Sequence, residues 1–178
     1  MATQYIDADK KVIAIRPRTF EAAAGTGAGS VEEVAVEVKK AGVTVLEFKS
    51  RVGDTVDIEA AEVLVAVGQG LNSQDDLPAV EELAKKLGGE VACSKPVATD
   101  KKWLSEERII GLSGKKCKPQ LAMLLGISGQ VQFTVGIRDA KTIVAVNSDE
   151  NASINQMADY IITADLHDVV AEMNKKLG

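Results

Sequence analysis

Short apolar runs that end at a glycine or a polar residue constrain the fold of this chain most strongly. Several are separated by segments with helical spacing, and strands that alternate with helices form right-handed βαβ units in a parallel sheet. The sequence therefore predicts an α/β fold with a doubly wound parallel sheet. The predicted strands are Val63–Val67, Val91–Cys93, Ile109–Ile110, Leu121–Leu125, Thr142–Val146 and Tyr160–Thr163.

Two segments have the spacing of amphipathic helices. In the first, apolar residues from Leu77 to Leu87 recur three, three and four positions apart. Asp76 is expected to cap the start of this helix, and Gly88 is expected to end it. The second segment is the C-terminal helix, whose predicted apolar face consists of Leu166, Val169, Val170, Met173 and Leu177.

The first part of the chain, residues 1–57, follows a different pattern. It contains the β-branched runs Val12–Arg16, Val31–Val38 and Val43–Phe48, with no helical spacing between them. Strands without intervening helices do not form a parallel sheet. We therefore expect a β-rich N-terminal arm that packs on another domain or a partner, followed by a main domain over residues 58–178.

Composition narrows the classes of partner. The net charge is −5 and there is no long basic run, which argues against nucleic-acid binding. No apolar stretch approaches the roughly 18–20 residues that cross a bilayer, so no membrane insertion is expected. The start of the chain does not resemble a signal peptide. Cys93 and Cys117 lie far apart in sequence and form no CxxC pair, so we expect reduced thiols rather than a disulfide. These features predict a cytoplasmic protein.

Glycine and small polar residues follow the predicted strands. The clearest cases are Gly68-Gln69-Gly70, Gly111–Gly114 and Gly126–Gly129, with Ser94 and Asn147 after two other strands. A single such turn is more often an ordinary loop. The carboxyl ends of parallel strands share one edge, however, where open α/β sheets bind ligands. Neither G-x-G-x-x-G nor a P-loop occurs, so the pattern predicts a nucleotide site of a less common type, with Gly126–Gly129 as the phosphate cradle.

Hydrolytic and metal chemistry are not expected. His167 is the only histidine, and its place near the apolar face of the last helix suggests a solvated residue rather than a general base. Ser128 lies in G-I-S-G and not in the G-x-S-x-G of a nucleophile elbow. Asp165 and Asp168 alone do not provide the cluster that a metal needs. No catalytic residue and no metal ligand is therefore predicted.

From Val63 onward the chain resembles the C-terminal, Rossmann-like FAD-binding domain of the electron transfer flavoprotein alpha subunit. The ordered motifs that carry this resemblance are V-A-V-G-Q-G-L-N-S-Q-D-D-L, A-C-S-K-P, I-G-L-S-G, L-G-I-S-G-Q-V-Q, K-T-I-V-A-V-N-S-D and A-D-Y-I-I-T-A-D-L. The resemblance implies an FAD-dependent electron carrier. Its implied partners are a beta subunit and a flavin dehydrogenase such as an acyl-CoA dehydrogenase.

The resemblance also implies roles for individual positions. Gly126 to Gln132 would surround the pyrophosphate and flavin side of FAD, and Asn147 would hold the adenosine. Ser113 would lie beside flavin N5. The residues expected to contact FAD are Gln69, Ser94, Lys95, Ile110, Gly111, Leu112, Ser113, Gly126, Ile127, Ser128, Gly129, Gln130, Val131, Gln132, Phe133, Asn147, Asp165 and Leu166.

Four positions depart from the family pattern. Gln69 and Lys95 stand where the family has arginine, Leu112 where it has glutamine, and Phe133 where it has histidine. Lysine keeps the charge of arginine but not its planar stacking group. These departures leave an alternative open, in which the chain binds NAD, AMP or CoA, or serves as an assembly module, without redox activity of its own. Flavin colour in the purified protein distinguishes the two hypotheses.

Overall fold

The computed structural model describes residues 3–14, 20, 24–25, 27, 29–37, 42, 44, 46–47 and 56–178. The chain divides into two units, Met1–Phe48 and Lys49–Gly178, which are considered separately. The regular structure of the described residues belongs to the second unit. The predicted domain boundary between Asp57 and Ile58 remains a prediction.

The β-rich arm remains a prediction, because much of residues 1–57 lies outside the described part of the chain. Residues 12–14, 31–37, 44 and 46–47 lie in no strand, and the rest of the three predicted runs lies outside the described part of the chain. The side chains of Val31, Val34 and Val36 are exposed. A strand needs a neighbour for its backbone N–H and C=O groups, and β-branched composition alone does not supply one. No described residue provides that neighbour.

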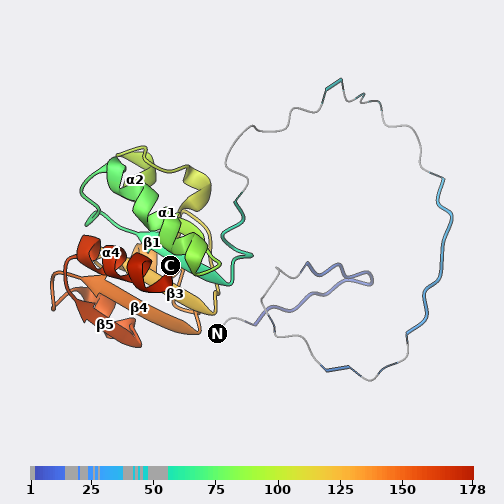
Figure 1. Ribbon diagram of the computed structural model, residues 1–178. Helices are drawn as coiled ribbons and strands as arrows, with labels where there is room; N and C mark the ends of the chain where they lie inside the picture. The colour runs from blue at the N-terminus through green and yellow to red at the C-terminus, as the bar shows by residue number, and fades with distance from the viewer. Residues whose placement is uncertain are drawn as a thin grey trace. The chain divides into compact units, whose positions relative to one another are not determined.

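Five parallel strands form the sheet of the second unit (Figure 1). Their order, β2-β1-β3-β4-β5, reverses direction between β1 and β3, as in other doubly wound sheets. This arrangement confirms the predicted fold class. The strands are β1 (Val63–Val67), β2 (Glu90–Cys93), β3 (Leu121–Leu125), β4 (Thr142–Asn147) and β5 (Tyr160–Thr163).

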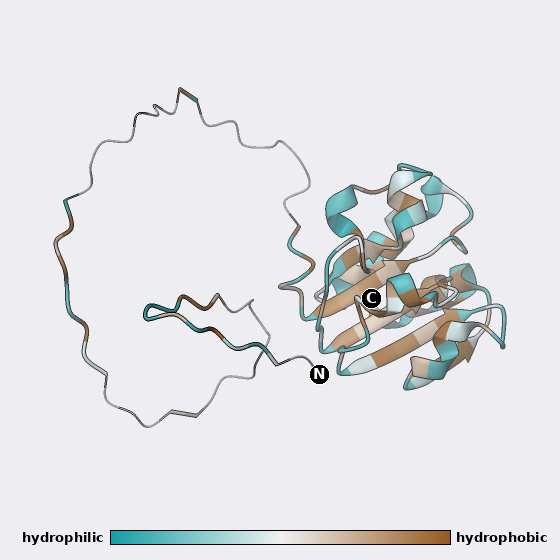
Figure 2. Ribbon diagram, turned by 180° about the vertical axis from the view of Figure 1, so that it is seen from behind, coloured by the Kyte–Doolittle hydropathy of each residue, from teal (hydrophilic) through white to brown (hydrophobic). Residues whose placement is uncertain are grey.

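Each face of the sheet carries its own apolar core, because successive side chains of a strand point to opposite faces. On β1, Val65 and Val67 join the core beneath the helices, whereas Leu64 and Ala66 join the opposite core. Apolar residues dominate the strands (Figure 2). The first core packs against helices α1 (Leu77–Lys86), α2 (Lys95–Thr99) and α4 (Leu166–Leu177). The second is closed by the short helix α3 (Val131–Thr134), the 3-10 turn η3 (Ser153–Met157), Ile58 and Ile137.

Helix α1 follows the predicted apolar spacing, but its N-terminal cap differs from the prediction. Asp76 occupies the cap position without a capping bond from its side chain. Ser73 and Asp76 instead form a capping box around the 3-10 turn η1 (Gln74–Asp76) that leads into the helix. Gly88 ends the helix with a φ of +68°, as expected. Burial of Leu83 and its apolar neighbours holds the helix on the sheet. Each large apolar side chain that is fully buried stabilises the fold by about 1.5–3 kcal/mol.

The predicted strand between β2 and β3 was wrong, and a helix that the sequence pattern did not indicate precedes it. The segment after β2 contains α2, a helix of five residues with a proline in its first turn. Ile109–Ile110 is not a strand but forms isolated bridges, from Ile109 to Cys93 and from Ile110 to Lys115. Two residues are too few for a ladder, so Ile109 only pairs beside the last residue of β2.

The C-terminal region supplies the outer edge of the sheet and the last helix. All four residues of β5 are exposed, including Tyr160 and Ile161. On α4, Leu166 and Val170 are buried as predicted, whereas Leu177 is largely exposed. No helix within residues 56–178 or the other described residues is long and apolar enough to cross a membrane.

Candidate functional site

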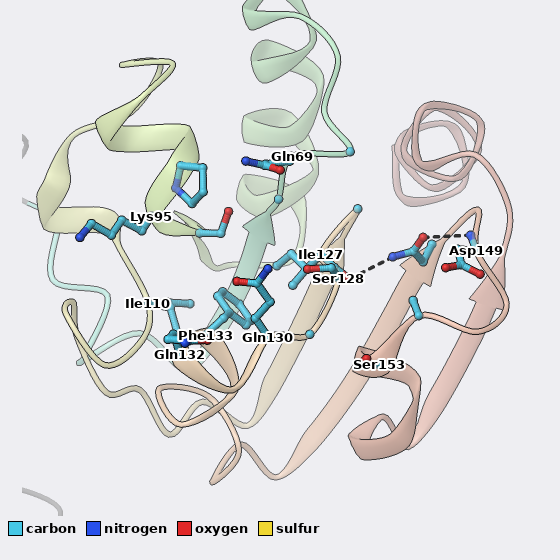
Figure 3. Close-up of a pocket in the computed structure, with 18 of the residues that line it drawn as sticks. Gln69, Lys95, Ile110, Ile127, Ser128, Gln130, Gln132, Phe133, Asp149 and Ser153 are labelled. Carbon is cyan, nitrogen blue, oxygen red and sulfur yellow. Dashed lines mark hydrogen bonds between the residues drawn. The ribbon is translucent and has the colours of Figure 1, made fainter.

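A cleft of about 1140 Å³ lies at the carboxyl ends of the strands (Figure 3). It is lined by the segments that follow all five strands, where the sequence places glycine and polar residues. The structure therefore brings the predicted positions together at one edge of the sheet. Those that line the cleft are Gln69, Ser94, Lys95, Ile110, Leu112, Ser113, Gly126, Ile127, Ser128, Gly129, Gln130, Gln132, Phe133, Asn147, Asp165 and Leu166.

Two predicted positions do not line the cleft. Gly111 is buried, and the next residue, Leu112, donates its backbone N–H to the carbonyl oxygen of Gln132 at 2.7 Å. The loop after Ile110 is thus held against the α3 segment, with Gly111 beneath it. Val131 is largely exposed and lies outside the cleft, although its neighbours Gln130 and Gln132 face it.

The loops after β1 and β3 contact each other through their backbones. The N–H of Gly68 donates to the carbonyl oxygen of Leu125 at 2.9 Å, and that of Gly70 donates to Gly126 at 3.0 Å. Gly126 has a φ of +60°, and a Cβ placed on it would lie 2.8 Å from the Cα of Gly70. A side chain at Gly126 would therefore be strained and would push the two loops apart. These loops meet at the point where the strand order reverses.

The loop from Gly126 to Gln130 presents unused backbone donors. No described residue accepts a hydrogen bond from the N–H groups of Ser128, Gly129 or Gln130. Gly129 has a φ of +91°, and a Cβ there would meet the backbone nitrogen of Ile154. Successive N–H groups in such a loop form a concave, electropositive surface that suits phosphate oxygens.

Asn147 fixes the other side of this loop. Its Nδ2 donates to the carbonyl oxygen of Ile127 at 2.9 Å, and its Oδ1 accepts from the N–H of Asp149 at 2.9 Å (Figure 3). The side-chain amide therefore joins the loop after β3 to the loop after β4. Its oxygen is already engaged within the protein, so Asn147 organises the cleft wall that it lines.

The start of α4 closes the cleft beside β5. The Asp165 side chain caps this helix by accepting the N–H of His167 at 2.7 Å, and this bond lowers the pKa of the Asp165 carboxyl. His167 is not the solvated residue that was predicted. Its ring contacts Asp165 through Nδ1 at 2.7 Å and Asp76 through Nε2 at 3.1 Å. The hydrogen bond to Asp165 is the main cause of a raised pKa of His167.

Sequence reasoning missed part of the lining. The polar run after Asn147 was the available signal, because a polar loop at a strand end belongs to the same edge as the glycine turns. The helix α2 gave no such signal. The lining residues that were not predicted are Asn72, Pro96, Thr99, Asp100, Ser148, Asp149, Asn151, Ala152 and Ser153.

The side chains that line the cleft give it little positive charge. Lys95 is the only cationic residue among them, whereas Asp100, Asp149 and Asp165 are acidic. The Lys95 side chain is exposed and extends away from the central loop (Figure 3). An anionic ligand would therefore depend on backbone N–H groups more than on side-chain cations.

Two of the departures from the family pattern differ sharply in burial. Leu112 is 69% exposed, whereas Phe133 is 6% exposed and packs in the second core. Both line the cleft. Phe133 therefore contributes to the core as well as to the lining.

The cysteines are unsuited to nucleophilic catalysis. Cys93 is fully buried, and desolvation raises the pKa of its thiol to about 12. Cys117 is buried in the core on the other face of the sheet, and neither cysteine forms a disulfide. A reactive cysteine needs a lowered pKa and access to solvent. The described residues also include no group of three or more side chains that could hold a metal ion.

Comparison with known proteins identifies the domain. Residues 57–138 match the electron transfer flavoprotein FAD-binding domain. These residues belong to that family. Proteins named FixB from Escherichia coli strains UMN026 and HS are 37% and 36% identical to the chain over 169 residues. The matches cover 94% of this chain and 54% of each relative, so the chain spans about half the length of these curated relatives.

A solved structure also shares a limited likeness with the flavoprotein domain. It is a candidate thiamin diphosphate-dependent enzyme from Mycobacterium smegmatis, with a TM-score of 0.39 and 14% sequence identity. The likeness covers 66% of this chain and 25% of that protein. It carries no argument about the fold or the function.

The residues of the cleft fit the FAD of this family. A dinucleotide needs a long cleft with donors for its two phosphates, and the volume of about 1140 Å³ exceeds that of most small-molecule sites. The free N–H groups of Ser128 to Gln130 supply donors beside the reversal point of the sheet. Glycine at positions 68, 70 and 126 keeps the two central loops in close contact. FAD is therefore the cofactor of the family to which this domain belongs.

Proposed function

We propose that the chain acts as the FAD-binding part of an electron transfer flavoprotein alpha subunit and carries electrons between a dehydrogenase and an acceptor. The observation that carries this proposal is the loop of free N–H groups at the β1–β3 reversal point, in a domain of the FAD-binding family. Bound FAD would supply the redox chemistry, while the protein binds and orients it.

The cleft supports a division of roles along the cofactor. The N–H groups of Ser128, Gly129 and Gln130 would hold the pyrophosphate, and Asn147 would keep their loop in place. Asp165 and Leu166 would border the adenine end. At the other end the hydroxyls of Ser94 and Ser113 would approach the flavin, and Phe133 and Leu112 would exclude water from it.

The proposal extends to partners and location. A beta subunit and a flavin dehydrogenase such as an acyl-CoA dehydrogenase are the partners that the family resemblance implies. We place the protein in the cytoplasm, where cysteines that form no disulfide, such as Cys93 and Cys117, persist as thiols.

Titration of the purified full chain with FAD tests the proposal. We expect flavin absorption to co-purify with the protein or to appear after FAD is added, and binding to tighten when the beta subunit is present. A colourless protein that fails to take up FAD both alone and with the beta subunit would contradict it. Riboflavin serves as a control, because it lacks the phosphates that the loop at Ser128 is proposed to hold.

One observation favours the alternative of a nucleotide-binding module without redox activity. Leu112 and Phe133 line the cleft at positions where the family pattern has glutamine and histidine, so two apolar side chains replace two hydrogen-bonding ones there. Under this alternative AMP, NAD or CoA would bind at least as tightly as FAD. Parallel calorimetric titrations with these ligands separate the two functions, because an FAD-specific site binds FAD more tightly than AMP.

A further inference from the structure

The single histidine of the chain lies between two carboxylates. Its Nδ1 is 2.7 Å from Oδ1 of Asp165, and its Nε2 is 3.1 Å from Oδ2 of Asp76. The Asp76 oxygen also accepts the N–H of Ser73 at 3.0 Å, and the Asp165 oxygen also accepts the N–H of His167 at 2.7 Å. Both carboxylates are thus held by backbone donors as well as by the imidazole ring.

This geometry defines the charge state of the ring. An ionised carboxylate only accepts hydrogen bonds, so each contact requires a proton on the ring nitrogen that makes it. Two such contacts require protons on both Nδ1 and Nε2, which is the imidazolium form. The raised pKa of His167 agrees with this, since Asp165 and Asp76 favour the charged ring more than partial burial opposes it.

The two carboxylates belong to different connections of the chain, each of which contributes residues to the cleft. Asp76 ends η1, in the connection between β1 and α1 that carries the lining residue Asn72. Asp165 itself lines the cleft and caps α4. Beside it, a side-chain carbon of Leu166 lies 2.8 Å from where a Cβ of Gly126 would stand. The ring therefore connects two segments that are 91 residues apart in sequence and that both border the site.

We propose that His167 is a proton-dependent clamp, which in its charged form joins the β1–α1 and β5–α4 connections and so holds the cleft in shape to bind its ligand. The neutral ring has one N–H, so it can donate to Asp165 or to Asp76 but not to both. The other nitrogen then presents its lone pair to a carboxylate. When the ring loses a proton, one of its two hydrogen bonds to Asp165 and Asp76 is therefore lost.

The sign of the pH dependence follows from the charged groups that face the ring, namely Asp76 from the β1–α1 connection and Asp165 from the β5–α4 connection. The folded-state pKa of His167 is raised. Its contribution to stability is therefore complete below the unfolded pKa of about 6.5 and is lost as pH rises through the folded-state value. Ligand affinity should decline over the same interval. The ring is one-third exposed, so the effect is that of a partly screened ion pair.

Nuclear magnetic resonance tests the clamp without any ligand. Because the chain has one histidine, the imidazole nitrogen signals of the full protein belong to His167 alone. We expect both ring nitrogens to carry protons at pH 6 and the midpoint of the titration to lie above 6.5. In an Asp76→Asn variant the midpoint should fall towards 6.5. A midpoint at or below 6.5 in the unmodified protein would overturn the proposal.

Two substitutions at His167 test its effect on binding, which rests on the proposed function because FAD is the probe. The dissociation constant for FAD should rise about two- to fivefold between pH 5.5 and 8.5 in the unmodified protein. His167→Arg keeps a positive charge and several hydrogen-bond donors at every pH. This variant should therefore bind FAD tightly, with a dissociation constant that does not change with pH. His167→Gln is never charged and should bind weakly with a flat profile.

A matched control separates the clamp from general packing of α1 against α4. Asn174, seven residues after His167 on α4, donates to the carbonyl oxygen of Ala79 on α1, and neither residue lines the cleft. Asn174→Ala should lower stability but leave the pH profile of FAD binding unchanged. Equal pH profiles for the unmodified protein and both His167 variants would overturn the proposal. If FAD binds at no pH, the proposed function fails, while the titration of the ring and the pH dependence of thermal unfolding still decide the clamp.

Discussion

The Asn147 side chain and the Ile127 carbonyl are joined by a hydrogen bond of 2.9 Å that spans the loops after β4 and β3. Because the oxygen of the same amide accepts the N–H of Asp149, one side chain supports both loops. The residue therefore determines where the donors of the neighbouring Ser128 lie. It acts on a ligand through the loop that it holds.

Replacement of Asn147 by alanine should lower both stability and FAD affinity. Loss of two hydrogen bonds should reduce the free energy of unfolding by about 1–3 kcal/mol. Urea denaturation followed by circular dichroism measures this change. Asn147→Asp keeps the acceptor for Asp149 but loses the donor to Ile127, so it should weaken FAD binding while it retains part of the stability. An alanine variant as stable as the unmodified chain would contradict this role.

A methyl group at Gly129 should be more damaging than one at Gly88. Both glycines have positive φ, but a Cβ at Gly129 would meet the backbone of Ile154, whereas nothing lies within 4 Å of one at Gly88. Gly88→Ala should therefore lower the free energy of unfolding by only about 1–2 kcal/mol, the cost of placing an L-residue at positive φ. Gly129→Ala should cost more and should also displace the loop of free N–H groups. Denaturant midpoints and FAD titrations of the pair check this, and similar losses in both variants would argue against close packing at Gly129.

Phe133 and Leu112 should respond differently to truncation although both line the cleft. Phe133 is buried in the second core, so Phe133→Ala should lower the free energy of unfolding by about 3–5 kcal/mol. Leu112 is mostly exposed, so Leu112→Ala should change it by less than about 0.5 kcal/mol. Thermal and urea unfolding of the two variants measure the contrast. A destabilised Leu112 variant would show that its loop packs more tightly than its exposure indicates.

The thiols of Cys93 and Cys117 should be unreactive in the native protein. With a pKa of about 12 at Cys93, only about one molecule in ten thousand carries the thiolate at pH 8. Native protein should therefore react slowly with Ellman's reagent, and both cysteines should react quickly once urea unfolds the chain. Rapid release of one equivalent from native protein would mean that Cys93 or Cys117 reaches solvent. A Cys117→Ser variant assigns the reactive thiol in that case.

The sheet was predictable because its strands are short, continuous apolar runs that end at residues unable to extend them. Val63–Val67 ends at Gly68 and Leu121–Leu125 ends at Gly126, and both strands are where the pattern placed them. The same reasoning placed most of the cleft, since the residue after a parallel strand belongs to a known edge. Such local signals are independent of distant partners.

Features that depend on distant contacts could not be predicted in this way. The alternation around Val34 is typical of a strand, but no described neighbour pairs with it. Helix α2 is too short to show a period of 3.6 residues, so it resembled a loop. His167 appeared to be an isolated surface residue because Asp76, its partner at the end of η1, lies 91 positions earlier. Local spacing encodes neither the short helix nor this contact.

The pairing of β1 with β3 affects how strongly a bound ligand protects the protein from unfolding and proteolysis. The two strands are neighbours in the sheet, yet β2, α1 and α2 separate them along the chain. A ligand that touches the loops after both strands would act as a reversible crosslink between remote stretches of polypeptide. Saturation with such a ligand would resist unfolding by mass action, by about 2.7 kcal/mol at one hundred times its dissociation constant. Cofactor supply would then govern how long each copy of the protein survives proteolysis.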